Sequence, residues 1–157
     1  MLEQARLLET DADNLAAAQA APKAMPRLLV IDDDNLHRMI ICRVAARAGY
    51  APAGAATYDE AAQLVGEAAF DCITLDLSLG AHAGVEMLRH LWVIGCKAPI
   101  IVISGCDEMT YAETMKIAKS LNLNILESMS KPVDLAVLRN WFQRLKGERD
   151  VAADAAA

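Results

Sequence analysis

The sequence predicts an α/β domain built on a doubly wound parallel sheet of five strands, with helices on both faces. Three observations carry this prediction. Short, continuous apolar runs recur along the chain, which is typical of strands buried on both faces. Between them, apolar residues recur at the three- and four-residue intervals of amphipathic helices. Strand and helix alternate five times, and right-handed crossovers place such helices on both faces of one sheet.

The alternation begins with the aliphatic run LLVI at residues 28–31, which fits a first strand. A helix is expected next, because apolar residues then recur at every fourth position, at Leu36, Ile40 and Val44. The short run AGAA at 53–56 is a weaker candidate for the second strand. Together these segments predict the first unit of strand, helix and strand.

A second helix is expected from Thr57, which forms a capping box with Glu60 three residues later. Its apolar positions are Leu64, Val65 and Ala68. The run CITL at 72–75 then predicts the third strand. The third helix is indicated by an apolar stripe at Val85, Leu88 and Leu91.

The run IIVI at 100–103 predicts the fourth strand. A looser helical stripe follows at Met109, Ala112 and Ala118. The segment NILESM at 124–129 is a weaker fifth strand. Asp134 is placed to be the N-cap of a last helix, whose apolar positions are Leu135, Leu138, Phe142 and Leu145.

Both ends of the chain differ in composition from the alternating region. Residues 1–26 are rich in Ala, Gln and acidic residues, and Pro22 and Pro26 stop any helix ahead of the sheet. We therefore expect an N-terminal arm or leader helix over 1–26 and the domain itself over 27–146. A flexible C-terminal tail is expected over 147–157, where the sequence is alanine-rich.

Composition excludes several classes of function. Lys and Arg total 15 against 21 Asp and Glu, a formal net charge of −6, which argues against a general nucleic-acid binder. The 4 cysteines show no CxxC spacing and fit small apolar core residues in a reducing compartment. No signal-peptide pattern and no apolar stretch of membrane-spanning length is evident. We therefore expect a cytoplasmic protein that binds neither nucleic acid nor membrane.

Polar residues follow four of the five predicted strands. They are Asp32, Asp33, Asp76, Ser104 and Lys131. In an open parallel sheet the functional crevice lies beyond the carboxyl ends of the strands, where the strand order reverses, so these side chains are expected to converge. Each one, taken alone, is as well explained as a turn cap or a solvated loop residue. Their recurrence at four strand ends favours the functional interpretation.

The converging groups predict a chemistry. Carboxylates gathered in one crevice repel one another unless a cation or a proton joins them. Mg²⁺ suits such a site because it accepts a few carboxylates together with waters. An ammonium and a hydroxyl suit the oxygens of a transferred phosphoryl group, and an aspartate can be the nucleophile. The residues therefore predict phosphoryl transfer to Asp76, with Lys131 and Ser104 holding the product.

Residues 27 to 146 resemble the receiver domains of two-component response regulators. Four motifs carry the resemblance, each at a strand end: VIDDD, LDLSLGAHAGVEML, PIIVISG and SKPVD. The resemblance implies a flavodoxin-like receiver fold with strand order 2-1-3-4-5. It also implies that a sensor histidine kinase or a histidine phosphotransfer protein phosphorylates Asp76.

The same resemblance implies roles for the other residues. Mg²⁺ would be held by Asp33, Asp76 and the backbone carbonyl of Ser78, with Asp32 close by. Lys131 would pair with the phosphoryl group. Ser104, by the same resemblance, would swing to hydrogen-bond that group and pass the signal to the face formed by the last two helices and the fifth strand. Asp34 is expected to turn outward and to favour the dipole of the first helix.

The sequence departs from the family pattern at three places. Gly80 stands where the family often has a proline. Ser128, three residues before Lys131, stands where it often has an aromatic that reports activation, and Tyr111 is the candidate substitute. Ser104 and Lys131 are 27 residues apart, a longer separation than usual. A similar long segment is familiar from receivers attached to cyclic-di-nucleotide phosphodiesterase domains.

The expected function is that of a single-domain response regulator, not an enzyme, which is a monomer or weak dimer. It would signal through protein–protein interaction or act as a phosphate sink. One alternative is a pseudo-receiver, an interaction module independent of phosphorylation. Another is a receiver detached from a cyclic-di-nucleotide phosphodiesterase. An aspartate-dependent phosphatase is disfavoured, because Ser78 stands where such enzymes want a second aspartate.

Overall fold

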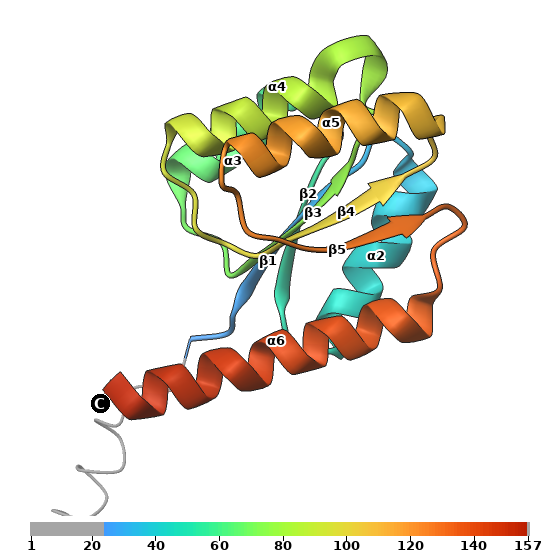
Figure 1. Cartoon of the computed structure of the whole chain (residues 1–157). Helices are drawn as coiled ribbons and strands as arrows, with labels where there is room; N and C mark the ends of the chain where they lie inside the picture. The colour runs from blue at the N-terminus through green and yellow to red at the C-terminus, as the bar shows by residue number, and fades with distance from the viewer. Residues whose placement is uncertain (1–23, 157) are drawn as a thin grey trace, which may run out of the picture.

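The computed structural model describes residues 24–156, except for the side chains of 81–83 (Figure 1). The strands are β1 (Arg27–Ile31), β2 (Ala51–Ala55), β3 (Cys72–Asp76), β4 (Ile100–Ser104) and β5 (Ile125–Ser130). The helices are α2 (Asn35–Arg47), α3 (Tyr58–Glu67), α4 (Gly80–Val93), α5 (Glu108–Ser120) and α6 (Leu135–Ala156). The strands form one parallel sheet in the order β2-β1-β3-β4-β5, which confirms the predicted fold class. The arm expected over 1–26 lies outside the described residues apart from its last three.

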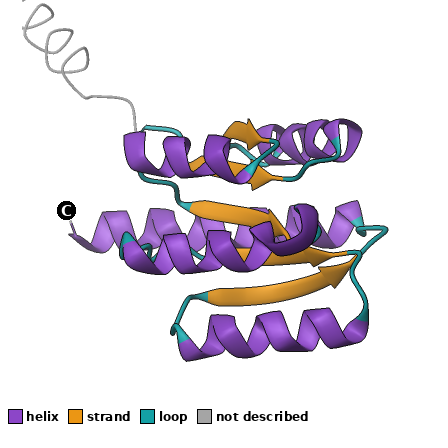
Figure 2. Ribbon diagram, turned by 90° about the horizontal axis from the view of Figure 1, so that it is seen from above, coloured by secondary structure: helices purple, strands orange, loops and turns teal. Residues whose placement is uncertain are grey.

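Helices cover the sheet on both faces, with α3, α4 and α5 on one side and α2 and α6 on the other (Figure 1). The helix axes lie roughly along the strands, and each helix runs back against the strand direction, as crossover connections between parallel strands require (Figure 2). In β1, Leu29 and Ile31 pack on the α3–α5 side, whereas Leu28 and Val30 pack on the α2–α6 side. All four are buried, because alternate side chains of a strand point to opposite faces and both faces are covered.

The strand register brings the polar strand ends to one edge of the sheet. The pairs at the carboxyl ends are Ile31–Leu75, Asp76–Ile103 and Ser104–Ser130. Asp32, Asp76 and Lys131 therefore end up at similar heights above the sheet. The strand order reverses at β1, which has β2 on one side and β3 on the other. The predicted crevice position, beyond the strands that flank this reversal, follows from the topology.

Three of the helix starts expected from the sequence are present. The carboxylate of Asp34 caps α2, the hydroxyl of Thr57 caps α3, and the carboxylate of Asp134 accepts from two N–H groups of the first turn of α6. The carboxylate of Glu60 accepts the N–H of Ala56 at 2.7 Å, one residue before the N-cap Thr57 whose N–H a capping box would use. Each cap satisfies backbone donors that a helix start leaves without an intrahelical partner.

The apolar stripe predicted for the first helix is wrong in phase. The fully buried residues of α2 are Ile41 and Ala45, whereas Leu36 is 61% exposed. Leu36 lies in the first turn, beyond the carboxyl ends of the strands, where no sheet surface is available to cover it. Ile40 and Val44 are half-buried at the flank of the contact with the sheet.

The last helix is longer than the sequence predicts. A flexible tail was expected from residue 147, but α6 continues to Ala156. Alanine has the highest helix propensity, and Lys146 pairs with Asp150 one turn later at 4.0 Å. Arg149 also pairs with Asp71, just ahead of β3, at 3.0 Å, which ties the extension to the sheet. None of the helices between residues 24 and 156 combines the length and apolar character needed to cross a membrane.

Candidate functional site

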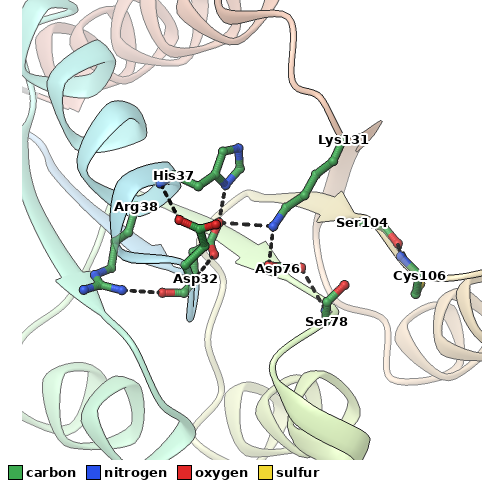
Figure 3. Close-up of polar contacts among 9 residues, drawn as sticks. Asp32, His37, Arg38, Asp76, Ser78, Ser104, Cys106 and Lys131 are labelled. Carbon is green, nitrogen blue, oxygen red and sulfur yellow. Dashed lines mark hydrogen bonds and ion pairs between the residues drawn. The ribbon is translucent and has the colours of Figure 1, made fainter.

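Asp76, the last residue of β3, lies at the centre of the site (Figure 3). Its side chain is only 1% exposed. Its Oδ1 accepts the backbone N–H of Ser78 at 2.8 Å, and its Oδ2 accepts from the Lys131 ammonium at 2.7 Å. A buried carboxylate with both oxygens hydrogen-bonded is held in one orientation.

Lys131 comes from the segment that follows β5. Its backbone N–H donates to the carbonyl of Ser104 at 3.0 Å, which fixes its position against the end of β4. Its ammonium lies 2.7 Å from Asp76 and 3.7 Å from Asp32. Burial lowers the pKa of Lys131, but the hydrogen bond to Asp76 and the attraction of the neighbouring carboxylates outweigh burial and raise this pKa above its ordinary value. The group is therefore a permanent cation at neutral pH.

Three carboxylates lie together, as the sequence predicts. One oxygen each of Asp32, Asp33 and Asp76 lies within 4.8 Å of the others. Asp32 and Asp76 are buried and Asp33 is exposed, so the cluster opens to solvent on one side. Lys131 supplies one positive charge against three carboxylates. This donor set of hard oxygens with a surplus of negative charge fits a divalent cation such as Mg²⁺.

Ser104 ends β4 and is 7% exposed. Its hydroxyl contacts the thiol of Cys106 and accepts the Cys106 N–H at 3.2 Å. In Figure 3 this pair lies to one side of Asp76, with no contact drawn between them. A pocket of about 300 Å³ adjoins the hydroxyl and reaches Tyr111 and Ser128. The structure thus places Ser104 at the predicted edge, with its hydroxyl engaged locally.

Comparison with known proteins identifies the family of this chain. The family model of the response regulator receiver domain matches residues 28–143. This chain belongs to the response regulator receiver family. The regulator of RpoS from Escherichia coli K12 is 28% identical over 119 residues, which are 75% of this chain and 34% of that protein. This chain therefore spans about a third of that relative's length.

A second relative is matched over most of its length. Sporulation initiation phosphotransferase F from Bacillus subtilis is 26% identical over 118 residues, covering 75% of this chain and 91% of that protein. Among solved structures, a response regulator from Colwellia psychrerythraea aligns with a TM-score of 0.67 at 23% identity, covering 80% of this chain and 99% of that one. At that identity, the likeness shows the fold alone.

One solved structure contains ligands. A response regulator protein from Burkholderia pseudomallei, with a phosphorylated aspartic acid, calcium ion and citrate, aligns at 27% identity with a TM-score of 0.62. The alignment covers 81% of this chain and 74% of that chain. A phosphorylated aspartic acid and a divalent cation therefore occur together in a protein similar to this receiver domain.

The loop after Asp76 differs from the family's proline pattern in its backbone. Gly80 has φ +73°, a left-handed conformation that proline, fixed near −65°, does not adopt. The N–H of Gly80 donates to the carbonyl of Ser78 at 2.7 Å. Four residues later, a Cβ on Gly84 would lie 2.8 Å from the carbonyl oxygen of Leu77. Glycine at both positions lets the start of α4 follow Asp76 closely, Gly80 through its left-handed backbone and Gly84 through its close approach to Leu77.

Tyr111 lies where it can contact the position of the missing aromatic. Its hydroxyl, on α5, donates to the hydroxyl of Ser128 on β5 at 2.5 Å. Both side chains are half-buried, and both line the pocket beside Ser104. An aromatic ring is therefore supplied to this part of the receiver domain from the helix instead of from the strand.

Two residues of the site were missed by the sequence analysis. His37 Nδ1 contacts Oδ2 of Asp32, and the Arg38 guanidinium donates to the backbone carbonyl of Asp32 at 2.7 Å. A signal was present, because Asp34 was recognised as lying at a helix start. Residues three and four positions after an N-cap lie in the first turn, close to the loop that the helix follows.

Proposed function

We propose that this receiver domain accepts a phosphoryl group on Asp76 from a histidine kinase or a histidine phosphotransfer protein, in a reaction that depends on Mg²⁺. The observation that carries the proposal is the surroundings of Asp76. Its buried carboxylate is paired with Lys131 and shares an open-sided cluster with two further carboxylates. A structural ion pair alone has no need of the two additional acids.

The transfer follows from this arrangement. A carboxylate oxygen of Asp76 attacks the phosphorus of a phosphohistidine, the new O–P bond forms, and the P–N bond breaks. The electron pair of that bond stays on the imidazole nitrogen, which takes up a proton from solvent. Lys131 holds the Asp76 carboxylate in place and then faces the oxygens of the bound phosphoryl group. The ammonium thus compensates charge in the substrate complex and in the product.

The cation would be held by the carboxylates of Asp33 and Asp76 and the backbone carbonyl of Ser78, with Asp32 close by. When bound, Mg²⁺ supplies neutralisation of the charge on the phosphoryl oxygens. The carboxylates of this chain bind and orient it. Because Asp33 is exposed while Asp32 and Asp76 are buried, the cluster is reached from the Asp33 side.

We assign the readout of phosphorylation to Ser104. Its hydroxyl is hydrogen-bonded to the thiol of Cys106, and we propose that it leaves this contact to hydrogen-bond a phosphoryl group on Asp76. The pocket that reaches Tyr111 and Ser128 adjoins this hydroxyl. Movement of Ser104 would therefore alter the pocket that joins α5 to β5, and we propose that a partner protein reads phosphorylation at this face. A phosphate sink uses the same transfer without this readout.

The pseudo-receiver alternative is favoured by one observation, the serine at position 128. The intact set of Asp32, Asp33, Asp76 and Lys131 opposes it, because a module that ignores phosphate has no use for this cluster. Phosphorylation separates the two functions, since only the receiver takes up a phosphoryl group.

The test is phosphorylation by a small donor, acetyl phosphate or phosphoramidate, with Mg²⁺, read as the gain in intact mass. We expect one phosphoryl group on the wild-type chain and none on Asp76→Asn. The matched control is Asp59→Asn, an exposed aspartate in the first turn of α3, which keeps the wild-type gain. Uptake by Asp76→Asn equal to wild type refutes the proposal. Some receivers accept a phosphoryl group only from their protein partner. For that case, binding of beryllofluoride is measured through the change in tryptophan fluorescence.

A further inference from the structure

Asp32 is held by the chain at every one of its polar atoms. Its backbone N–H donates to Ala55 at 3.0 Å, and its carbonyl accepts from Arg38 at 2.7 Å. In the carboxylate, Oδ1 accepts the N–H of Asp34 at 2.9 Å and Oδ2 contacts Nδ1 of His37. Figure 3 shows the His37 ring lying over this carboxylate. Within residues 24–156, neither Asp33 nor Asp76 forms a side-chain hydrogen bond or ion pair with a residue of α2.

The local structure explains why His37 meets Asp32. The backbone N–H of His37 donates to the capping carboxylate of Asp34 at 2.9 Å, which fixes the first turn of α2. Nδ1 is the ring nitrogen nearest the backbone, so it reaches the loop directly beneath. The side chain is 19% exposed, so water has limited access to the contact. Arg38 anchors the main chain of the same aspartate from the next position.

We infer that His37 is a positioning residue for the cation site: its Nδ1–H donates to Asp32 and fixes the orientation of that carboxylate toward the cation. This inference rests on the proposed function. Groups that hydrogen-bond a carboxylate near a metal commonly change metal affinity by 10- to 100-fold when removed, because the carboxylate loses its fixed orientation. The hydrogen bond from His37 fixes the Asp32 carboxylate, so its remaining lone pairs face the cation site. Without His37 the carboxylate can rotate and lose this orientation.

The experiment is a Mg²⁺ titration by isothermal calorimetry with no phosphodonor present. It compares wild type with His37→Leu, which removes the donor, and His37→Asn, whose side-chain N–H₂ can occupy the position of Nδ1. The matched control is His90→Leu, which removes a histidine of α4 that packs against the ring of Tyr58. Thermal unfolding and circular dichroism establish that each variant is folded.

We expect the Mg²⁺ dissociation constant to rise by about 10- to 100-fold in His37→Leu, to return most of the way to wild type in His37→Asn, and to stay unchanged in His90→Leu. A folded His37→Leu that binds Mg²⁺ as tightly as wild type overturns the inference and leaves the proposed function standing. The inference is likewise overturned if His37→Asn binds Mg²⁺ as weakly as His37→Leu. A wild-type chain that binds no Mg²⁺ overturns the proposed function, and the inference with it.

Discussion

Replacing Asp33 with asparagine should stabilise the metal-free protein. A carboxylate oxygen of Asp33 lies within 4.8 Å of oxygens of Asp32 and Asp76, so three like-charged side chains are gathered in one place. Asp33 is exposed, so the substitution leaves no buried group without a partner. The amide keeps the size of the side chain and removes its charge. The expected result therefore depends on the balance between repulsion from the two neighbouring carboxylates and attraction to Lys131.

The size of the effect follows from these distances. Two unit charges at 4.8 Å repel by about 0.9 kcal/mol in water, and by about 3.5 kcal/mol at an effective dielectric constant of 20. The lower value applies to Asp33 because it is exposed. Two such repulsions, less the lost attraction to Lys131, leave a gain in the free energy of unfolding of about 1 kcal/mol. For a chain of this size that gain raises Tm by roughly 2–4 °C.

The assay is thermal and urea unfolding of wild type and Asp33→Asn, with chelator and then with Mg²⁺. Bound Mg²⁺ stabilises the wild-type protein by mass action, and this gain should shrink in Asp33→Asn because one carboxylate ligand is lost. Glu113→Gln, which removes the charge of an exposed acid on α5, is the control and gains no stability in chelator. The advantage of Asp33→Asn should also fall at high salt, which screens an exposed charge. An Asp33→Asn that is less stable than wild type in chelator, with an unchanged response to Mg²⁺, refutes the reasoning.

Two further predictions concern the core and the ammonium of the site. Phe142→Ala should lower the free energy of unfolding in urea by about 3–5 kcal/mol, since the fully buried ring packs on Tyr50 at 5.8 Å; a loss below 1 kcal/mol contradicts this. Because folding raises the pKa of Lys131, its contribution to stability is complete below the unfolded value of 10.5 and is lost as pH rises through the folded pKa. The stability difference between wild type and Lys131→Met should therefore shrink above pH 10.5, and a constant difference contradicts it.

The fold and the clustering of the site were predictable because both depend on simple periodicity. The aliphatic runs that became β1, β3 and β4 are buried on both faces, so apart from the buried Thr74 of β3 they stay apolar until the sheet ends. The first polar residues after those runs therefore had to lie at one edge. Asp32, Asp76 and Ser104 were found in this way, and Lys131 was found after the weaker run that became β5. The Lys131 ammonium lies 2.7 Å from Asp76 and 3.7 Å from Asp32, because the strand register brings these strand ends together.

What the sequence did not predict depends on geometry within a turn or on weak patterns. The second strand begins at Ala51 and not at residue 53, because an edge strand of sequence APAGA has little apolar signal. His37 was missed since its contact with Asp32 depends on how the first turn of α2 is rotated, which spacing alone does not determine. The length of α6 was missed because the pairing of Arg149 with Asp71 joins residues far apart in the chain.

The proposed function requires that Asp76 is the residue that receives the phosphoryl group. The most direct measurement is to phosphorylate the full chain in Mg²⁺, reduce the acyl phosphate with borohydride, and locate the resulting homoserine by peptide mass spectrometry. We expect homoserine at position 76 and none in samples treated without phosphodonor. Homoserine at position 32 or 33, with aspartate intact at 76, would contradict it.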